Sequence, residues 1–207
     1  RKLVNLGYNV YFQNVIDGYP QDLEKVIQGY KNQPYIETKN KLVVVTGAGG
    51  GSGKMALCLS QIYSEKSRGI NSGYAKFETF PIWNLPVEHP INVAYEASTA
   101  DLGDFNEVDP YHKKEYGILA TNYNRDIENF AILENILVKI TGEKFPFGYK
   151  SPTDMGINMA AAGIVNDEVC KKASLEEIIR RYFRYLVEKL TGKETQKTVD
   201  RITEILS

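Results

Sequence analysis

The sequence has few cysteine, histidine and tryptophan residues, and it has no long apolar run. Among 207 residues there are two cysteines, two histidines and one tryptophan. Cys58 and Cys170 are far apart and form no CxxC or metal-ligand spacing, so we expect two small buried side chains in a reducing compartment. No apolar stretch approaches the roughly 20 residues that span a bilayer, and no signal peptide is visible. We therefore expect no membrane partner.

The chain also lacks an excess of charge of either sign. Its 25 basic and 26 acidic residues give a net charge of -1, which does not indicate a nucleic-acid partner. A hydrophobic fraction of 43% and a charged fraction of 25% are typical of a globular domain with one good core or two small ones. There is no initiator Met, and residues 1–12 are typical of a helix end, Gly7 and a strand. We therefore expect an α/β domain that is incomplete at its N-terminus.

One stretch, residues 41–62, organises the rest of the chain. Residues 42–45 form an apolar run that predicts a strand buried on both faces, a glycine-rich loop follows, and Lys54 begins a helix. Glycines permit backbone N–H groups to turn inward around an anion, and the first N–H groups of the helix point back at the loop. This pattern predicts a phosphate cradle. Its expected ligand-binding residues are Thr46, Gly47, Gly49, Gly50, Gly51, Ser52, Gly53, Lys54 and Met55.

Two known motifs fit these residues, and a plain tight turn is a third reading. In a Walker A loop, Ala48 replaces the leading glycine and Met55 replaces the hydroxyl residue that binds Mg²⁺, so the metal role stays open. In the TG-x-x-x-G-x-G loop of short-chain dehydrogenases, Tyr185 and Lys189 supply a YxxxK. However, that motif has no companion Ser here, and both residues fit an amphipathic helix. The Walker A reading is favoured because Lys54 stands directly at a helix start.

Two further strands are expected after the loop, over residues 73–77 and 91–95. The first would place Lys76, Glu78 and Thr79 near its carboxyl end, where ligands of open α/β sheets bind. An acid that follows an apolar strand often holds Mg²⁺ directly or through water. Glu96 and Asp101 are therefore candidate catalytic residues, and a helix cap or surface acid is the alternative for both.

From about residue 109 onward the pattern becomes helical. Helices are predicted over residues 109–119, 125–140, 154–171, 174–190 and 194–206, and an earlier one over residues 20–30. Ser174 with Glu177 predicts a capping box. The predicted fold class is α/β, with a parallel-sheet, P-loop-like domain over residues 1–108 followed by an all-helical domain over residues 109–207.

Two polar clusters interrupt the helical half, over residues 121–126 and 149–156. Each contains residues that commonly cap helices, and each also contains a cation, Arg125 or Lys150. The planar guanidinium of Arg125 can bind an anion at two points, so Arg125 is a candidate for balancing transferred charge. Both clusters together with the cradle predict a ligand cleft between the two halves.

Four long segments carry a family resemblance that covers nearly the whole chain: TGAGGGSGKMALCLSQIY, GYAKFETFPIWNLPVEHPINVAYEAST, NYNRDIE and YKSPTDMGIN. They resemble the bacterial domain-of-unknown-function family 1846. The resemblance implies a cytoplasmic protein of which this chain is a central portion, and it implies kinship without a defined activity. Family members have carried an ATP-dependent peptidase label, but this chain shows no HExxH, no GxSxG and no Cys/His arrangement.

Taken together, these patterns predict ATP-dependent phosphoryl transfer or ligation, as in a phosphotransferase or ATPase. Lys54 would hold the β-phosphate, Glu96 or Asp101 a Mg²⁺ ion or water, and Arg125 the transferred charge. The alternative is a non-catalytic module that binds a phosphorylated metabolite, and the third reading is an NAD(P)-binding oxidoreductase. The expected partner is a small phosphate or nucleotide ligand, and a homo-oligomer is compatible with the sequence.

Overall fold

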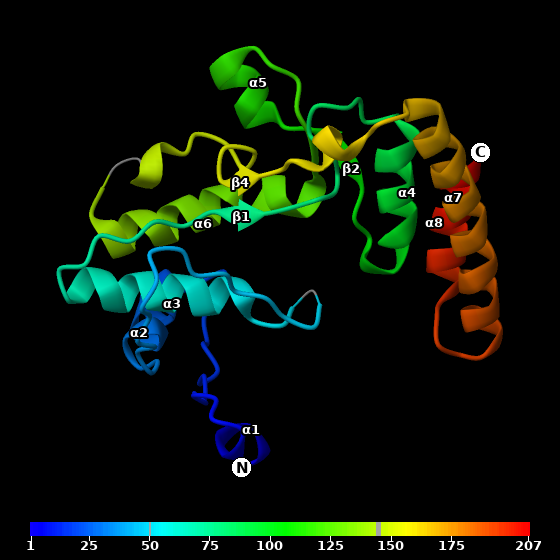
Figure 1. Ribbon diagram of the computed structural model, residues 1–207. Coiled ribbons are helices and arrows are strands. Elements are labelled where there is room, and N and C mark those ends of the chain that lie inside the picture. Colours follow the sequence, from blue (N-terminus) through cyan, green and yellow to red (C-terminus); the bar gives the residue numbers. More distant parts are fainter. Residues whose placement is uncertain (50, 144–145) are drawn as a thin grey trace. The chain divides into compact units, whose positions relative to one another are not determined.

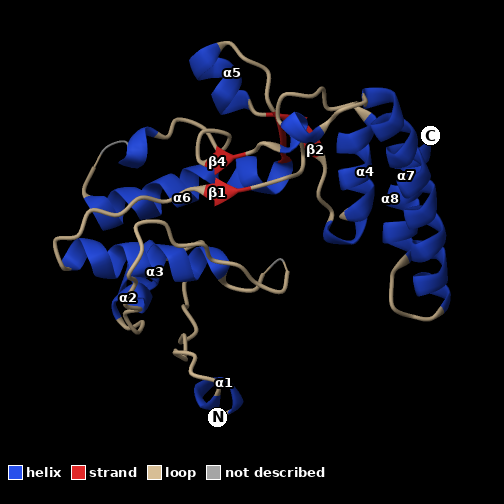
Figure 2. Cartoon of the chain, in the orientation of Figure 1, coloured by secondary structure: helices blue, strands red, loops and turns tan. Residues whose placement is uncertain are grey.

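The structure is a computed structural model that describes residues 1–49, 51–143 and 146–207. The described residues form mainly helices, with a few short strands (Figure 1, Figure 2). They divide into two compact units. Unit 1 contains Arg1–Tyr74 and Ala131–Gly148, and unit 2 contains Ala75–Phe130 and Tyr149–Ser207. The chain is therefore α/β with little strand, and each unit has its own buried residues.

Unit 1 is built on helices that pack through a few apolar side chains. It contains α1 (Lys2–Asn5), α2 (Leu23–Lys31), α3 (Lys54–Ser67) and the second part of α6 (Asn124–Thr141), followed by the 3-10 turn η2 (Pro146–Gly148). Asp22 caps α2 by accepting from the N–H of Lys25 at 3.1 Å. Helices α2 and α3 contact each other. The buried apolar side chains of these helices are Val26, Tyr30, Leu59, Ile62, Leu133, Ile136, Leu137 and Ile140.

The largest element of unit 2 is a group of three helices, α4 (Pro90–Ser98), α7 (Asp167–Leu190) and α8 (Gln196–Leu206), which lie side by side (Figure 1). Their side-chain caps are His89, Asn166 and Thr195. Small residues on α4 permit close approach of α7 and α8. The buried cluster between them consists of Ala94, Ala97, Ala100, Ile178, Tyr185, Val199 and Ile202.

Two short strand pairs complete unit 2. Strand β1 (Lys76–Phe77) pairs in parallel with β4 (Gly156–Ile157), and β2 (Asn106–Val108) pairs antiparallel with β3 (Thr121–Tyr123). Helix α5 (Pro110–Tyr116) lies between β2 and β3 in the chain, the 3-10 turn η1 (Ala100–Leu102) precedes β2, and the 3-10 turn η3 (Ala160–Gly163) follows β4. Asp109 is fully buried and holds this region together.

The network around Asp109 joins α5 to the segment before β4. One carboxylate oxygen of Asp109 accepts from the N–H groups of Tyr111 and His112, which caps α5. The other oxygen accepts from the N–H and the hydroxyl of Thr153, the latter at 2.6 Å. Buried carboxylates with several donors are strongly stabilised, so this network fixes the start of β4.

The predicted buried strand over residues 42–45 is wrong. The segment is extended, but no strand among the described residues pairs with it, and Leu42 and Val44 are 80% and 78% exposed. The strand expected within residues 8–12 is likewise unpaired. An apolar run indicates only that a segment favours burial on both faces, and it does not show whether neighbouring strands are there to bury it. A P-loop-like parallel sheet around residues 42–45 is therefore not confirmed.

Three other local predictions also fail. Residues 91–95 lie in helix α4, because Pro90 starts the helix under the His89 cap and the apolar Ile91, Ala94 and Ala97 follow a three-residue spacing. Residues 154–171 are not one helix, because they contain β4 and η3 before α7 begins. Ser174 is not a cap, since it lies inside α7 and donates to the carbonyl of Cys170 at 2.8 Å.

Most helical predictions are confirmed within a few residues, namely those for α2, α5, α6 and α8, together with the part of α7 over residues 174–190. The domain boundary between residues 108 and 109 stays a prediction. Helix α6 contributes residues to both compact units. None of the helices formed by the described residues is long and apolar enough to cross a bilayer.

Candidate functional site

The glycine-rich loop of unit 1 leads directly into α3. Gly53 is the N-cap of this helix with φ +83°, and Gly51 has φ +69°, so both positions need the left-handed conformation that glycine adopts easily. No side chain caps the helix start. The first N–H groups of α3 therefore depend on other acceptors, which is the condition for anion binding at a helix N-terminus. Gly50 lies outside the described residues.

The ammonium group of Lys54 lies within this loop. Its Nζ donates to the carbonyl of Gly49 at 2.6 Å and lies 3.2 Å from the hydroxyl of Ser52. The Ser52 hydroxyl donates to the same Gly49 carbonyl at 2.8 Å. A Cβ on Gly47 would stand 2.3 Å from the Ser52 hydroxyl, so a larger residue there would require the Ser52 side chain to move. The loop is closed on its own lysine, and an incoming anion would have to replace the Gly49 carbonyl.

The remaining loop positions offer little for a metal. Thr46 is exposed, and Met55 is half-buried with a thioether that is a weak ligand for Mg²⁺. Among the residues that the structure describes, no group of three or more His, Cys, Asp or Glu side chains could hold a metal ion. The loop therefore presents an ammonium group and backbone amides, without a carboxylate partner of its own.

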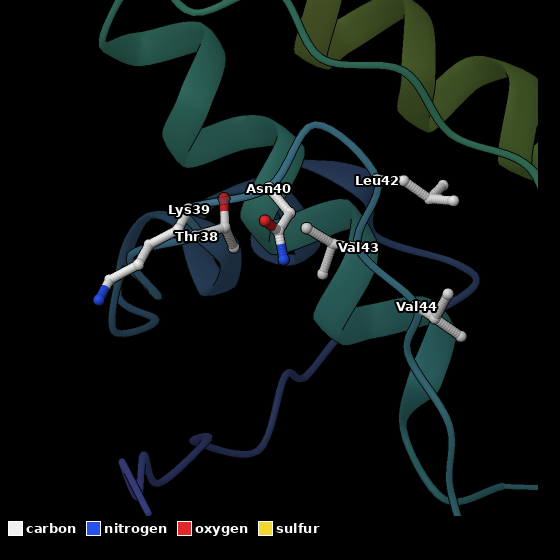
Figure 3. Close-up of a pocket in the computed structure, with 6 residues that line it drawn as sticks. All are labelled: Thr38, Lys39, Asn40, Leu42, Val43 and Val44. Atoms are coloured by element: carbon white, nitrogen blue, oxygen red, sulfur yellow. The ribbon is translucent and has the colours of Figure 1, made fainter.

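A shallow hollow of about 300 Å³ borders the segment that leads into the loop (Figure 3). In Figure 3 the side chains of Leu42 and Val44 point to one side and that of Val43 to the other, as in an extended chain. The lining residues are Thr38, Lys39, Asn40, Leu42, Val43 and Val44. All of them come from one short segment, so the hollow adds no converging polar groups to the loop.

The candidate acids Glu96 and Asp101 lie in unit 2 and have structural partners. One oxygen of Glu96 is paired with Arg201 on α8, and the other accepts from the N–H of Asn106 at 2.9 Å. Asp101 accepts from the hydroxyl of Tyr185 at 3.2 Å. Both carboxylates connect α4 and η1 to neighbouring elements of the same unit. Their roles in catalysis stay predictions.

Arg125 stands at the start of α6 and is paired with a buried acid. Its Nη2 lies 2.7 Å from an oxygen of Asp104, and its guanidinium lies 5.7 Å from the centre of the Tyr123 ring. The Arg125 side chain is about half exposed, whereas Asp104 is buried. The structure thus describes two separate sets, the Lys54 loop in unit 1 and Glu96, Asp101 and Arg125 in unit 2.

A second polar centre lies in unit 2, where β1, β3 and α6 meet, and we call it the Lys76 cluster. It consists of Lys76, Glu78, Tyr123 and Asp126. The ammonium of Lys76 contacts an oxygen of Asp126 and lies 3.1 Å from Oε1 of Glu78. The Tyr123 hydroxyl donates to the same Glu78 oxygen at 3.3 Å. One ammonium group therefore pairs with two carboxylates. The side chains of Lys76, Glu78 and Asp126 are only 11–17% exposed.

One carboxylate oxygen each of Glu78 and Asp126 lacks a hydrogen-bond partner among the described residues. Oε2 of Glu78 and Oδ2 of Asp126 are buried, and neither has a hydrogen-bond partner among the described residues. A buried acceptor without a donor is costly, so such an atom calls for a proton, a water or a ligand. The formal charge of Lys76, Glu78 and Asp126 together is negative by one. The cluster is thus one positive charge short of neutrality.

Burial and charge shift the protonation of the cluster. Burial raises the pKa of Glu78; Lys76 opposes this shift and Asp126 adds to it. Burial alone would lower the pKa of Lys76, but Glu78 and Asp126 together hold it above its ordinary value. Burial, aided by Glu78 and Asp126, also strongly raises the pKa of Tyr123. The raised pKa of Lys76 keeps the lysine charged, and the raised pKa of Glu78 favours its protonated form.

Sequence reasoning placed Lys76 and Glu78 near a strand end but did not join them to Tyr123 and Asp126. The visible signal was the alternation around exposed Phe77, which puts Lys76 and Glu78 on the same face of β1. Their partners lie about 45 to 50 positions further along the chain. No local pattern predicts that contact.

Other polar residues that stood out in the sequence stabilise the fold. Lys150 is paired with Glu115 and is not a free cation. His112 is largely buried, with Nδ1 2.9 Å from the Ser151 hydroxyl. His89 accepts from the N–H of Ile91 at 3.3 Å and caps α4.

The family profile and the most similar relatives that were compared point to the same family. The profile of the family described as "Domain of unknown function DUF1846, N-terminal" matches residues 1–207. A UPF0371 protein of Corynebacterium efficiens is 50% identical over the whole chain, which covers 42% of that relative. UPF0371 proteins of Clostridium tetani and Fusobacterium nucleatum are 52% and 51% identical over 97% of the chain, which covers 40% of each relative. The chain spans about two-fifths of the length of these bacterial relatives, and it belongs to the DUF1846 family.

Proposed function

We propose that the glycine-rich loop before α3 binds the phosphate groups of a nucleotide such as ATP, and that this binding serves phosphoryl transfer or ligation. The observation that carries the proposal is the position of Lys54. Its ammonium lies within the loop, 2.6 Å from the Gly49 carbonyl, at a helix start that no side chain caps. Backbone amides, the helix dipole and a cation then act on the same anion.

Binding requires only a local exchange. A phosphate oxygen would replace the Gly49 carbonyl as the acceptor for Lys54, and other phosphate oxygens would accept from the first N–H groups of α3. Charge-assisted hydrogen bonds to phosphate are stronger than the neutral bond that is lost. Because Met55 has no hydroxyl, we expect any Mg²⁺ to be held by the phosphate oxygens of the nucleotide and by water, and not by residue 55.

Calorimetric titration tests this proposal. ATP, ADP, inorganic phosphate and NAD would each be titrated with and without Mg²⁺ into the wild type and into Lys54→Ala. We expect ATP binding that Lys54→Ala weakens by about tenfold or more, consistent with the loss of one charge-assisted contact. Lys66→Ala is the matched control, since Lys66 lies at the other end of α3 and pairs with Glu143 at the surface.

The pattern of binding separates the alternatives. Metal-dependent ATP binding favours phosphoryl transfer, whereas binding of phosphate alone, indifferent to Mg²⁺, favours a non-catalytic metabolite module. Binding of NAD that survives Lys54→Ala favours an oxidoreductase. If no phosphate compound binds at millimolar concentration, the proposal is wrong.

A second candidate function is proton transfer at the Lys76 cluster, favoured by the buried, partnerless Oε2 of Glu78. Glu78 would hold a proton that it exchanges with a bound substrate, while the ammonium of Lys76 contacts Asp126. Carbon-13 NMR of the side-chain carboxyls, assigned with Glu78→Gln, measures this directly. We expect Glu78 to titrate above its ordinary value of 4.5. Titration at or below that value would remove the basis for this candidate.

A further inference from the structure

The extended segment over residues 42–45 is apolar on both of its sides. Leu42 and Val44 point to one side and are 80% and 78% exposed, and Val43 points to the other side and is 53% exposed (Figure 3). A strand at the surface of a sheet has apolar side chains on one side only, whereas a strand inside a parallel sheet has them on both. The β-branched valines also favour the strand conformation. Residues 42–45 therefore have the composition of an internal strand.

The backbone of this segment is unpaired on both edges. In the part of the chain that the structure describes, no N–H or C=O group of residues 37–46 is hydrogen-bonded to another backbone group. The preceding fixed point is Ile36, whose N–H and C=O are bonded to the side chain of Gln61 on α3 at 3.2 and 2.8 Å. Rows of N–H and C=O groups are matched by another extended strand and not by a helix. The backbone therefore fits strands as its partners.

Residues 8–12 form a second segment of the same kind. Tyr8, Val10 and Phe12 stand at alternate positions and are 63%, 38% and 84% exposed. No N–H or C=O group of residues 9–13 is hydrogen-bonded to another backbone group among the described residues. Both segments belong to unit 1, whose described residues contain no paired strand. Unit 1 thus has two strand-like segments and no sheet.

We propose that residues 8–12 and 42–45 become sheet strands in the full-length proteins of this family, paired with strands from the part of the chain outside residues 1–207. The relatives contain such additional chain, since this chain covers 42% of the Corynebacterium efficiens protein and 40% of the Clostridium tetani protein. More than half of each relative is therefore available to supply strands. Pairing also fixes the segment from which the glycine-rich loop starts. The inference holds whether or not that loop binds phosphate.

A second copy of this chain supplies less than the segment over residues 42–45 requires. Two copies that pair through this segment add one strand to one edge of each. The other edge and both apolar sides then stay exposed. An internal strand needs a partner on each edge and a packed layer on each side. Additional chain of the length found in the relatives can provide all of these, so we assign the cover to the same molecule.

Amide hydrogen exchange, followed by mass spectrometry at about 5 μM protein, tests the proposal. It compares this chain with the full-length Corynebacterium efficiens relative, which is 50% identical over the whole chain. We expect the amides of residues 42–46 to exchange as in an unstructured peptide here, and the aligned amides of the relative to exchange at least about 100-fold more slowly. The buried turn of α3 from Leu59 to Ile62 is the control and should be protected in both. Fast exchange of residues 42–46 in both proteins, or slow exchange in both, overturns the proposal.

A proline substitution distinguishes strand pairing from apolar cover alone, because proline has no N–H to donate. Val44→Pro should leave the thermal midpoint of this chain unchanged, since the N–H of Val44 has no backbone acceptor among the described residues. At the aligned position of the full-length relative, proline should lower the midpoint by about 5 °C or more. Asn71→Pro is the matched control, because Asn71 is exposed and its N–H is likewise unpaired with described backbone. Equal midpoints for the two variants of the relative would contradict strand pairing.

Discussion

At the scale of single residues, Lys76 neutralises buried negative charge. In the part of the chain that the structure describes, it is the only cation in contact with both Glu78 and Asp126. Lys76→Met would leave two buried carboxylates facing each other. Removing one partner of a buried ion pair typically costs about 3–5 kcal/mol, so we expect a loss of unfolding free energy of that order. Urea denaturation at pH 7 measures it.

Lys150→Met is the matched control for that experiment, because Lys150 forms a pair with Glu115 that is exposed to solvent. Exposed pairs contribute little to stability, and we expect a midpoint close to that of the wild type. Equal effects of the two substitutions would show that the Lys76 cluster is not buried in solution.

The raised pKa of Glu78 predicts how the stability of the protein depends on pH. Its pKa is raised in the folded state, so the folded protein binds a proton more tightly than the unfolded chain does. The stabilisation that this tighter proton binding gives is fully present below the ordinary pKa of 4.5. It is lost as the pH rises through the pKa that Glu78 has in the folded protein. Glu78→Gln cannot ionise, so its stability relative to wild type should improve between pH 4 and pH 8. Denaturation midpoints at pH 4, 6 and 8 measure this, and a flat difference would contradict it.

Gly156 supports a prediction about packing. A Cβ at this position would lie 2.2 Å from the ring of Trp83, and the glycine has an ordinary φ, so the restriction comes from the indole and not from the backbone. We expect Gly156→Ala to destabilise the fold by about 1–3 kcal/mol, as forced overpacking does. Gly163→Ala is the control, since a Cβ there meets nothing within 4 Å. Thermal unfolding of both variants compares them.

At the scale of elements, the sequence predicted helices better than strands. Helices α2, α6 and α8 have apolar residues at helical spacing, and that periodicity is local information. Helix α4 was mistaken for a strand because Ile91 and Val93 are β-branched, although the cap at His89 and the proline after it indicated a helix start. Residues 42–45 were mistaken for a buried strand because burial depends on neighbours that no local pattern reveals.

The candidate site residues also differ in how far the sequence could predict their contacts. The glycine-rich loop and the helix start at Lys54 were predictable because they are adjacent in sequence, whereas the hydrogen bond from Lys54 to the Gly49 carbonyl was not predicted. The Lys76 cluster was predictable only in half, because Asp126 is 50 residues from Lys76 and reaches it through tertiary packing. The structural partners of Glu96 were equally hidden, since Arg201 is 105 residues away.

At the scale of the whole molecule, two compact units share one helix, and α6 changes from one unit to the other between Phe130 and Ala131. Unit 2 contains the Lys76 cluster, whereas unit 1 contains the glycine loop. The tests of these two features are therefore separable. Glu78→Gln should leave the calorimetric response of the Lys54 loop to ATP unchanged.

The exposed, extended segment over residues 42–45 has a consequence for handling the protein. Its apolar side chains alternate, and no strand of the described residues occupies its backbone hydrogen-bonding positions (Figure 3). Such a segment is a template onto which an extended strand of another molecule can add. Concentrated solutions should therefore form β-rich aggregates over time, and a lysine in place of Val44 should delay their onset without changing the helical content.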